Sequence, residues 1–209
     1  MGSQMLENWD ATRRKWILYT SQESHSAYCE KYPFEKIPKN IFLDTNVINI
    51  IVKYPYQIFE HEDIPIDIPV SRAKEIEALM HIFYVGQRAC WNISASEKCL
   101  EEINQTSDSD LKHDLSEYAH GLIDFRSADR GHSRNLGRRL SDSSICSALP
   151  DPSDRELLGN AIGLGCDVFC TCDHKTIISK RDFLPKLPLQ ILSPIEWWYH
   201  IKPWAGLWC

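Results

Sequence analysis

Three acidic residues stand where regular secondary structure would bring them to one edge of a sheet. Asp44 follows the apolar run Ile41–Leu43, and Asp173 follows the apolar segment Cys166–Thr171. Asp154 stands in the first turn of a helix expected to begin at an Asp-Pro cap. Ligands of parallel sheets gather at the carboxyl ends of the strands. Clustered carboxylates suit Mg²⁺ and Mn²⁺, so the sequence predicts a site for hard divalent cations.

A fourth acid is expected from the helix that contains Cys99 and Ile103. At about 100° per residue, these two apolar residues lie within about 40° of each other and define the buried face. Glu102 lies about 60° from Cys99, at the edge of that face, whereas Glu101 lies about 160° away and faces solvent. Glu102 is therefore predicted to face the cleft, with Glu101 and Glu97 as the alternatives.

Each acid also has a purely structural interpretation. Asp44 fits a turn, and Asp151 and Asp173 fit helix caps. Asp154 fits a carboxylate that complements a helix dipole, and Glu102 fits a solvated helix residue. Taken singly, none of these residues establishes a site.

The elements that must position these acids alternate between strands and helices. Four short apolar segments are predicted strands: Ile41–Leu43, Trp91–Ile93, Cys166–Thr171 and Leu189–Leu192. Helices are predicted from a Ser71 cap to Arg88, after a Ser94/Glu97 capping box, through Leu111–Leu122, and from Asp151 to a stop at Gly165. The prolines of Ile58–Pro69 predict an extended loop. This order predicts an α/β fold with a largely parallel sheet.

In their order and spacing, four segments resemble the successive motifs of the PIN-domain family. They are Ile41-Phe-Leu-Asp44-Thr-Asn-Val47, Ser96-Glu-Lys-Cys-Leu-Glu-Glu102-Ile103, Asp151-Pro-Ser-Asp154-Arg-Glu-Leu-Leu158 and Asp167-Val-Phe-Cys-Thr171-Cys-Asp173. The resemblance extends from about Asn40 to Trp197 and includes the closing segment Ile191-Leu-Ser-Pro194. It implies a three-layer α/β/α sandwich around a mostly parallel sheet and a metal-dependent nuclease, usually acting on RNA.

By the same resemblance, the metal ligands are Asp44, Glu102, Asp154 and Asp173. Residues expected to orient them or the attacking water are Thr45, Asn46 and Thr171, with Asp151 as an accessory acid. One or two Mg²⁺ or Mn²⁺ ions would activate water and neutralise the phosphate.

The activity that follows is endonucleolytic cleavage of single-stranded RNA, as in toxin-type PIN proteins that have a neutralising, antitoxin-like partner. DNA or structured nucleic acid is the alternative substrate, and a non-catalytic RNA-binding or partner-binding module is the alternative class. A haloacid-dehalogenase-like phosphatase is disfavoured, because Asn46 stands where that chemistry needs a second Asp.

The 209 residues have a net charge of 23 − 29 = −6, which argues against binding to nucleic acid through bulk positive charge. Without the four candidate ligands, 25 acids remain against 23 bases. Basic residues are concentrated in the segment 126–139, where Arg126, Arg130, Arg134 and Arg138 recur every four residues and could contact an RNA backbone. Two glycines in this segment favour an irregular loop over a helix.

Three regions are predicted: a helical N-terminal extension over residues 1–38, a PIN-like domain over 39–198 and a Trp-rich tail over 199–209. We interpret Met1–Gln4 as a cloning remnant and expect helical spacing from Leu6 onward. The tail is expected to dock on its own core or to form a homodimer.

The eight cysteines are expected to be reduced in a cytoplasmic protein that has no signal peptide and no membrane span. Cys166, Cys170, Cys172 and His174 lack the spacing of a zinc knuckle, so core packing is the favoured interpretation.

Overall fold

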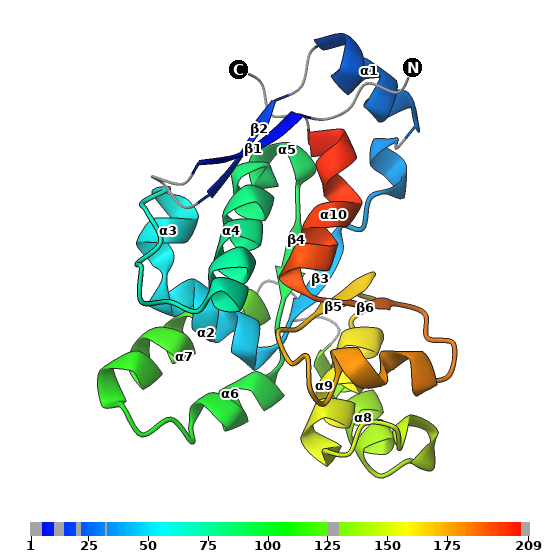
Figure 1. Cartoon of the computed structure of the whole chain (residues 1–209). Helices are drawn as coiled ribbons and strands as arrows, with labels where there is room; N and C mark the ends of the chain where they lie inside the picture. Colours follow the sequence, from blue (N-terminus) through cyan, green and yellow to red (C-terminus); the bar gives the residue numbers. More distant parts are fainter. Residues whose placement is uncertain (1–5, 11–14, 20–21, 32, 125–129, 206–209) are drawn as a thin grey trace. The chain divides into compact units, whose positions relative to one another are not determined.

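The computed structural model describes residues 6–10, 15–19, 22–31, 33–124 and 130–205 (Figure 1). The chain divides into two compact units. The first comprises Met1–Ile37, Tyr54–Cys90 and Pro194–Cys209, and the second comprises Pro38–Lys53 and Trp91–Ser193. All four candidate metal ligands belong to the second unit.

The second unit is built on a four-stranded, all-parallel sheet in the order β4-β3-β5-β6. Its strands are β3 (Asn40–Leu43), β4 (Asn92–Ser94), β5 (Val168–Cys170) and β6 (Gln190–Leu192). Ile41 stands opposite both Ile93 and Val168. The rings of Phe42 and Phe169 stack with their centroids 5.5 Å apart. Both central strands are buried and consist almost entirely of apolar residues, as a strand covered on both faces should be. The predicted α/β class with a parallel sheet is confirmed.

The sheet has a topological switch point between β3 and β5. The chain leaves β3 for β4 on one side, and later adds β5 and β6 on the other side. Hydrogen bonds extend the pairing beyond the strands: Asp44 N donates to Cys170 O at 3.0 Å, and Thr171 N donates to Leu192 O at 3.0 Å. Asp44 and Thr171 therefore lie at the position where parallel sheets open a crevice for ligands.

Helices of the second unit carry the remaining candidate residues. They are α2 (Thr45–Lys53), α6 (Glu97–Ile103), α7 (Ser109–Asp124), α8 (Arg130–Ser141) and α9 (Pro152–Gly163), with 3₁₀ turns η3 (Ser144–Cys146) and η4 (Ile178–Phe183). The predicted start of α9 is confirmed, because the Asp151 side chain accepts a hydrogen bond from Ser153 N at 2.9 Å. Its predicted stop is confirmed by Gly165, which has φ +66°.

The expected irregular structure of the Arg126–Arg139 segment is wrong from Arg130 onward, because α8 begins there. Arg126 lies outside the described residues. The glycines that argued against a helix allow α8 to pack closely on α9. A Cβ at Gly159 would lie 2.7 Å from the Cα of Gly137, closer than side chains approach a backbone. Tertiary packing thus outweighs the low helix propensity of glycine here.

The expected caps at Ser94 and Ser71 are also wrong. Ser94 is the last residue of β4, and its buried hydroxyl donates to Ile41 O at 3.3 Å. The N-cap of α6 is Ser96. Ser71 lies inside α4 (Val70–Tyr84), which begins after Pro69. In both places the regular structure starts or ends within two residues of the expected boundary.

The first unit contains a two-stranded antiparallel sheet and several helices. Its elements are β1 (Leu6–Asp10), β2 (Lys15–Tyr19), α1 (Gln22–Lys31), η1 (Phe34–Lys36), α3 (Pro55–Phe59), α4, α5 (Gly86–Ala89) and α10 (Pro194–Ala205). The predicted helical extension is wrong over Leu6–Asp10 and Lys15–Tyr19, which form a strand pair with Trp9 opposite Trp16. Aromatic and β-branched residues favour strands, and this preference wins there. The helix is confirmed at α1. The predicted loop begins only after Phe59, because Ile58 belongs to α3.

The two tryptophans near the start of α10 are buried. Trp197 and Trp198 are inaccessible or nearly so, and the ring of Trp198 stacks on His81 of α4 at 4.9 Å. The Trp204 ring lies 5.4 Å from that of Phe34. Trp197 and Trp198, which precede the predicted tail, are thus core residues. Within the tail, Trp204 contacts Phe34, and Trp208 lies outside the described residues.

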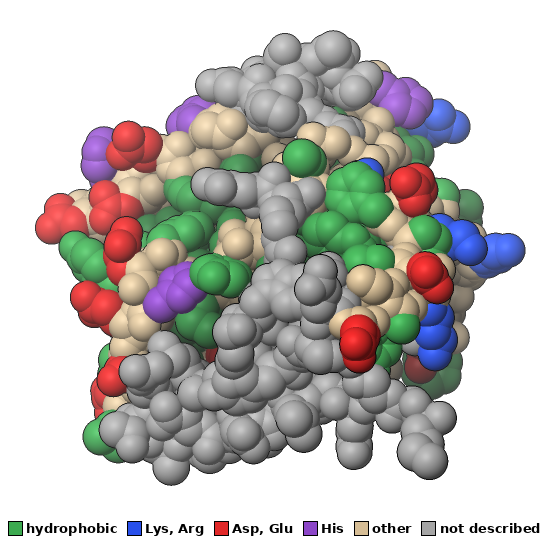
Figure 2. Space-filling model, turned by 90° about the horizontal axis from the view of Figure 1, so that it is seen from above, with side chains coloured by type: hydrophobic (Ala, Val, Ile, Leu, Met, Phe, Trp, Pro, Cys, Tyr) green, Lys and Arg blue, Asp and Glu red, His purple; other side chains and the backbone are tan. Residues whose placement is uncertain are grey.

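One face of the molecule carries patches of hydrophobic side chains beside acidic ones, as Figure 2 shows. None of the seven cysteines within the described residues forms a disulfide bond. Among the helices of the described ranges, none combines the length and the apolar character that a membrane span requires.

Candidate functional site

Asp44 is the centre of the candidate site. It is only 4% exposed and stands between the end of β3 and the first residue of α2. Its Oδ2 accepts hydrogen bonds from Thr171 Oγ1 and from Asn46 Nδ2, both at 2.6 Å. The Asp44 carboxylate is therefore held in one orientation by residues from β3–α2 and from the end of β5.

Asn46 and Thr171 tie the ends of the two central strands together. Asn46 Nδ2 also donates to Thr171 Oγ1 at 3.1 Å, and Asn46 Oδ1 accepts from Cys172 N at 2.8 Å. The Thr171 hydroxyl in turn accepts from Asp173 N at 3.0 Å. One donor and two acceptor positions of that hydroxyl are thereby satisfied. The structure thus places Asn46 and Thr171 between Asp44 and Asp173.

Glu102 is the acid of α6 that lies on the Asp44 side. Its Oε2 accepts from Thr45 Oγ1 at 2.6 Å, and its Oε1 accepts from Ser153 Oγ at 2.7 Å. The two alternatives point elsewhere: Glu101 is 57% exposed and pairs with Lys98, and Glu97 pairs with Arg134 at 3.0 Å.

Ser153 was not identified from the sequence. It belongs to the first turn of α9, and its hydroxyl joins that turn to Glu102. A serine beside an Asp-Pro cap is ordinary helix-start chemistry, so its type and spacing gave no signal of this second contact.

Thr176 joins the remaining two acids. Its hydroxyl lies 2.6 Å from Asp173 Oδ2 and 3.3 Å from Asp154 Oδ2, and its N–H donates to Asp173 Oδ1 at 2.7 Å. This residue, too, was missed from the sequence. Its signal was the spacing of three residues after Asp173, at which an Asp side chain accepts a hydrogen bond from a following backbone N–H. Asp173 therefore caps the turn that follows it, as its structural interpretation expected, while it also lies beside Asp154.

The four acids influence one another electrostatically. Burial raises the pKa of Asp44 to about 7; the hydrogen bond from Thr171 lowers it, and the charges of Glu102 and Asp154 raise it. The pKa of Asp154 is raised to about 6, first by burial and then by the charges of Asp151, Asp173 and Glu102. These mutual effects on the pKa values indicate that the four carboxylates share one field.

Asp173 is shifted in the opposite direction. Burial opposes its ionisation, but hydrogen bonds from the Thr176 side chain and from the N–H groups of residues 175–177 hold its pKa below the ordinary value. Neighbouring carboxyl groups with pKa values pushed apart are a feature of catalytic sites. One acid of the cluster stays ionised while two others retain protons more readily than usual.

The donor set consists of carboxylates with hydroxyl groups between them, which suits Mg²⁺ or Mn²⁺. In the present arrangement the hydroxyls of Thr45, Ser153, Thr171 and Thr176 bond to the carboxylate oxygens. Within the ranges that the structure describes, no three His, Cys, Asp or Glu side chains are grouped closely enough to hold an ion. The Thr176 hydroxyl bridges Asp154 and Asp173, and the mutual effects of their charges couple these acids to Asp44 and Glu102.

The cysteines near this site serve the core. Cys166 and Cys170 are buried, and Cys166 Sγ lies 3.4 Å from the Ser94 hydroxyl. Burial raises the pKa of the Cys99 thiol to about 12, so this thiol stays protonated at neutral pH. The favoured interpretation as core residues is confirmed for Cys166 and Cys170, whereas Cys172 follows β5 and is only half-buried.

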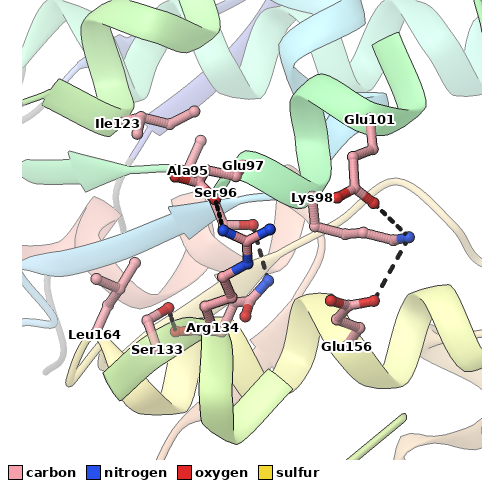
Figure 3. Close-up of a pocket in the computed structure, with 11 residues that line it drawn as sticks. Ala95, Ser96, Glu97, Lys98, Glu101, Ile123, Ser133, Arg134, Glu156 and Leu164 are labelled. Atoms are coloured by element: carbon pink, nitrogen blue, oxygen red, sulfur yellow. Dashed lines mark hydrogen bonds and ion pairs between the residues drawn. The ribbon is translucent and has the colours of Figure 1, made fainter. Parts of the chain in front are cut away.

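A separate hollow lies where α6, α8 and α9 meet (Figure 3), and none of the four acids lines it. Lys98 reaches toward Glu101 at 3.0 Å and Glu156 at 3.5 Å, as Figure 3 shows. Asn160 Nδ2 donates to Ser96 Oγ at 3.0 Å. The charged groups around this hollow are paired with one another, and the contacts join the three helices.

Basic side chains of α8 lie near the start of α9. The helix carries four arginines and no acid. Gly137 packs on Gly159, and a Cβ at Gly163 would lie 2.5 Å from Ser133 Cα, so the two helices run antiparallel. Arg138 and Arg139, both exposed, are therefore level with the second turn of α9, next to the turn that carries Asp154.

Neither a protein-family model, nor a curated protein, nor a solved structure matches this chain. The chain's own geometry is a cluster of four carboxylates, held by five polar side chains, at the switch point of a parallel sheet.

Proposed function

We propose that this protein is a divalent-metal-dependent nuclease of the PIN-like, three-layer α/β/α class, and that it cleaves single-stranded RNA endonucleolytically. One observation carries the proposal. Carboxylates from four separate segments are electrostatically coupled at the carboxyl ends of β3 and β5, and each accepts a hydrogen bond from a neighbouring hydroxyl group. Such an accumulation of negative charge is costly unless protons or cations compensate it.

The chain's residues divide into ligands and positioning groups. Asp44, Glu102, Asp154 and Asp173 would hold Mg²⁺ or Mn²⁺, which when bound supplies Lewis acidity and an activated water. The other residues keep the carboxylates oriented. Asn46 and Thr171 hold Asp44, Thr45 and Ser153 hold Glu102, and Thr176 holds Asp173.

The raised pKa values indicate how a cation would compete for the site. At neutral pH a proton on Asp44 relieves part of the repulsion from Glu102 and Asp154. A cation can take over this role only when that proton leaves, so metal binding should release protons. Cleavage should consequently increase as the pH rises through about 6 to 7, where Asp44 and Asp154 ionise.

Arg138 and Arg139 support a polyanionic substrate. They lie level with the α9 turn that follows the one carrying Asp154. Guanidinium groups bind phosphate oxygens by paired hydrogen bonds, and the affinity of such contacts falls as the salt concentration rises. These arginines would hold the strand on the approach to the acids.

The experiment is an incubation of the purified chain with end-labelled, unstructured RNA in Mn²⁺ or in EDTA, with single-stranded and duplex DNA in parallel. We expect RNA cleavage in Mn²⁺ alone, and at least about a hundredfold loss for Asp44→Asn, as is typical when a single electrostatic catalytic group is lost. Asp63→Asn, which changes an exposed acid of the other unit, is the matched control and should cleave normally. Cleavage of DNA alone would reassign the substrate, whereas full cleavage in EDTA would refute the metal mechanism. Binding of RNA without cleavage under any condition would favour a non-catalytic module.

A further inference from the structure

An exposed aromatic residue lies in a basic segment directly after Asp173. Phe183 is 75% exposed, although burial of an apolar side chain of this size stabilises a folded protein. Residues 174–186 around it carry four Lys or Arg residues and one acid, a net charge of 4 − 1 = +3. Lys180 and Lys186, on either side of Phe183 in the sequence, are exposed. An aromatic face flanked by cations is the composition of a nucleic-acid stacking platform.

This segment, drawn in orange in Figure 1, is anchored at both ends. At its start, Ile178 N donates to Asp173 O at 2.9 Å, and Ile177 is 1% exposed. Near its end, Arg181 Nη1 donates to Ile191 O of β6 at 3.0 Å. Phe183 is therefore presented by an ordered scaffold that is rooted on one of the four acids.

The length of η4 relates Phe183 to that acid. The turn begins at Ile178, which is hydrogen-bonded to Asp173, and ends at Phe183. At about 2 Å rise per residue, these five steps span about 10 Å. Phe183 therefore stands one short turn along the chain from the residue that is hydrogen-bonded to Asp173.

We propose that Phe183, with Lys180 and Lys186, stacks an unpaired base of the strand bound at the acid cluster. The inference rests on the proposed function and specifies its substrate as unpaired nucleic acid. An unpaired base offers a free face to an aromatic ring, whereas the bases of a duplex already stack on each other. The two lysines would neutralise the phosphates that flank the stacked base.

The test measures binding by fluorescence anisotropy, in Mn²⁺, with the full chain carrying Asp44→Asn to prevent cleavage. The probes are an unstructured RNA, an unstructured DNA and a blunt duplex. Phe183→Ala is compared with Tyr199→Ala, which removes another exposed aromatic residue, in α10. Both side chains are exposed, so neither change should disturb folding.

We expect Phe183→Ala to weaken binding of the unpaired probes about 5- to 100-fold, the loss of one stacked base, and to leave duplex binding within about twofold. Phe183→Trp should retain the affinity, and Tyr199→Ala should not change it. An unchanged affinity for Phe183→Ala overturns the platform, even if the chain cleaves RNA. A selective loss, found together with no RNA cleavage by the chain that retains Asp44, supports the platform and refutes the nuclease. If no probe binds to any variant, the platform fails.

Discussion

Replacing Asp44 by Asn should stabilise the metal-free protein, and the gain should grow with pH. The folded protein retains the Asp44 proton up to about pH 7, whereas the unfolded chain loses it near pH 3.8. Between these values the folded state binds more protons, so the free energy of unfolding falls as the pH rises. The amide introduced by Asp44→Asn is neutral throughout and can still accept a hydrogen bond from Thr171.

The size of the effect follows from the pKa of about 7. Each pH unit below that value changes the free energy of unfolding by about 1.4 kcal/mol. From pH 5 to pH 8 the free energy of unfolding of the unsubstituted chain should therefore fall by about 3 kcal/mol more than that of Asp44→Asn. Urea unfolding of both chains in EDTA, followed by circular dichroism, measures this difference. Asp63→Asn is the control and should follow the unsubstituted chain. The reasoning predicts that the difference in unfolding free energy between the two chains changes with pH. If this difference stays constant within about 1 kcal/mol from pH 5 to pH 8, Asp44 is not a buried carboxyl group with a raised pKa.

Three further predictions concern the packing and the neighbours of the acids. Gly159→Ala should lower the stability by about 1–3 kcal/mol in thermal or urea unfolding, because its Cβ meets the α8 backbone. Gly121→Ala, with open space around it, should raise the stability by up to about 1 kcal/mol. Equal effects of the two substitutions would contradict the close packing of α8 on α9. Thr176→Val should weaken Mn²⁺ binding about tenfold or more, with affinity restored by Thr176→Ser, and unchanged calorimetric affinity would remove Thr176 from the site. Charge reversal of Arg138 and Arg139 should weaken RNA binding and reduce the slope of log K against log salt by at least about 1, and an unchanged slope would exclude these arginines from the RNA contact.

The central strands and the start of α9 were predictable because local signals agree with tertiary structure. The apolar run Ile41–Leu43 can be buried only as a strand within so few residues, and Asp44 then has to stand at its end. An Asp-Pro pair fixes a helix start, which placed Asp154 in the first turn. The helical wheel placed Glu102 correctly on the side of α6 that approaches Thr45.

The elements that were predicted wrongly depend on distant contacts. Glycine is penalised in isolated helices, but Gly137 lies where α9 leaves no room for a side chain, so α8 forms. The spacing of Leu6, Trp9 and Trp16 fits a helix as well as a strand, and pairing between β1 and β2 decides the outcome. Hydroxyl groups such as that of Thr176 acquire their role only when two acids approach the same turn.

Calorimetric titration with Mn²⁺ at pH 6.5 tests most directly whether the acid cluster is a divalent-cation site. The unsubstituted chain should bind Mn²⁺ and release protons, because Asp44 and Asp154 must ionise to accept the ion. Asp44→Asn should lose most of this binding, and Asp63→Asn should retain it. Absence of Mn²⁺ binding by the unsubstituted chain, or equal binding by Asp44→Asn, would contradict the assignment of these four carboxylates.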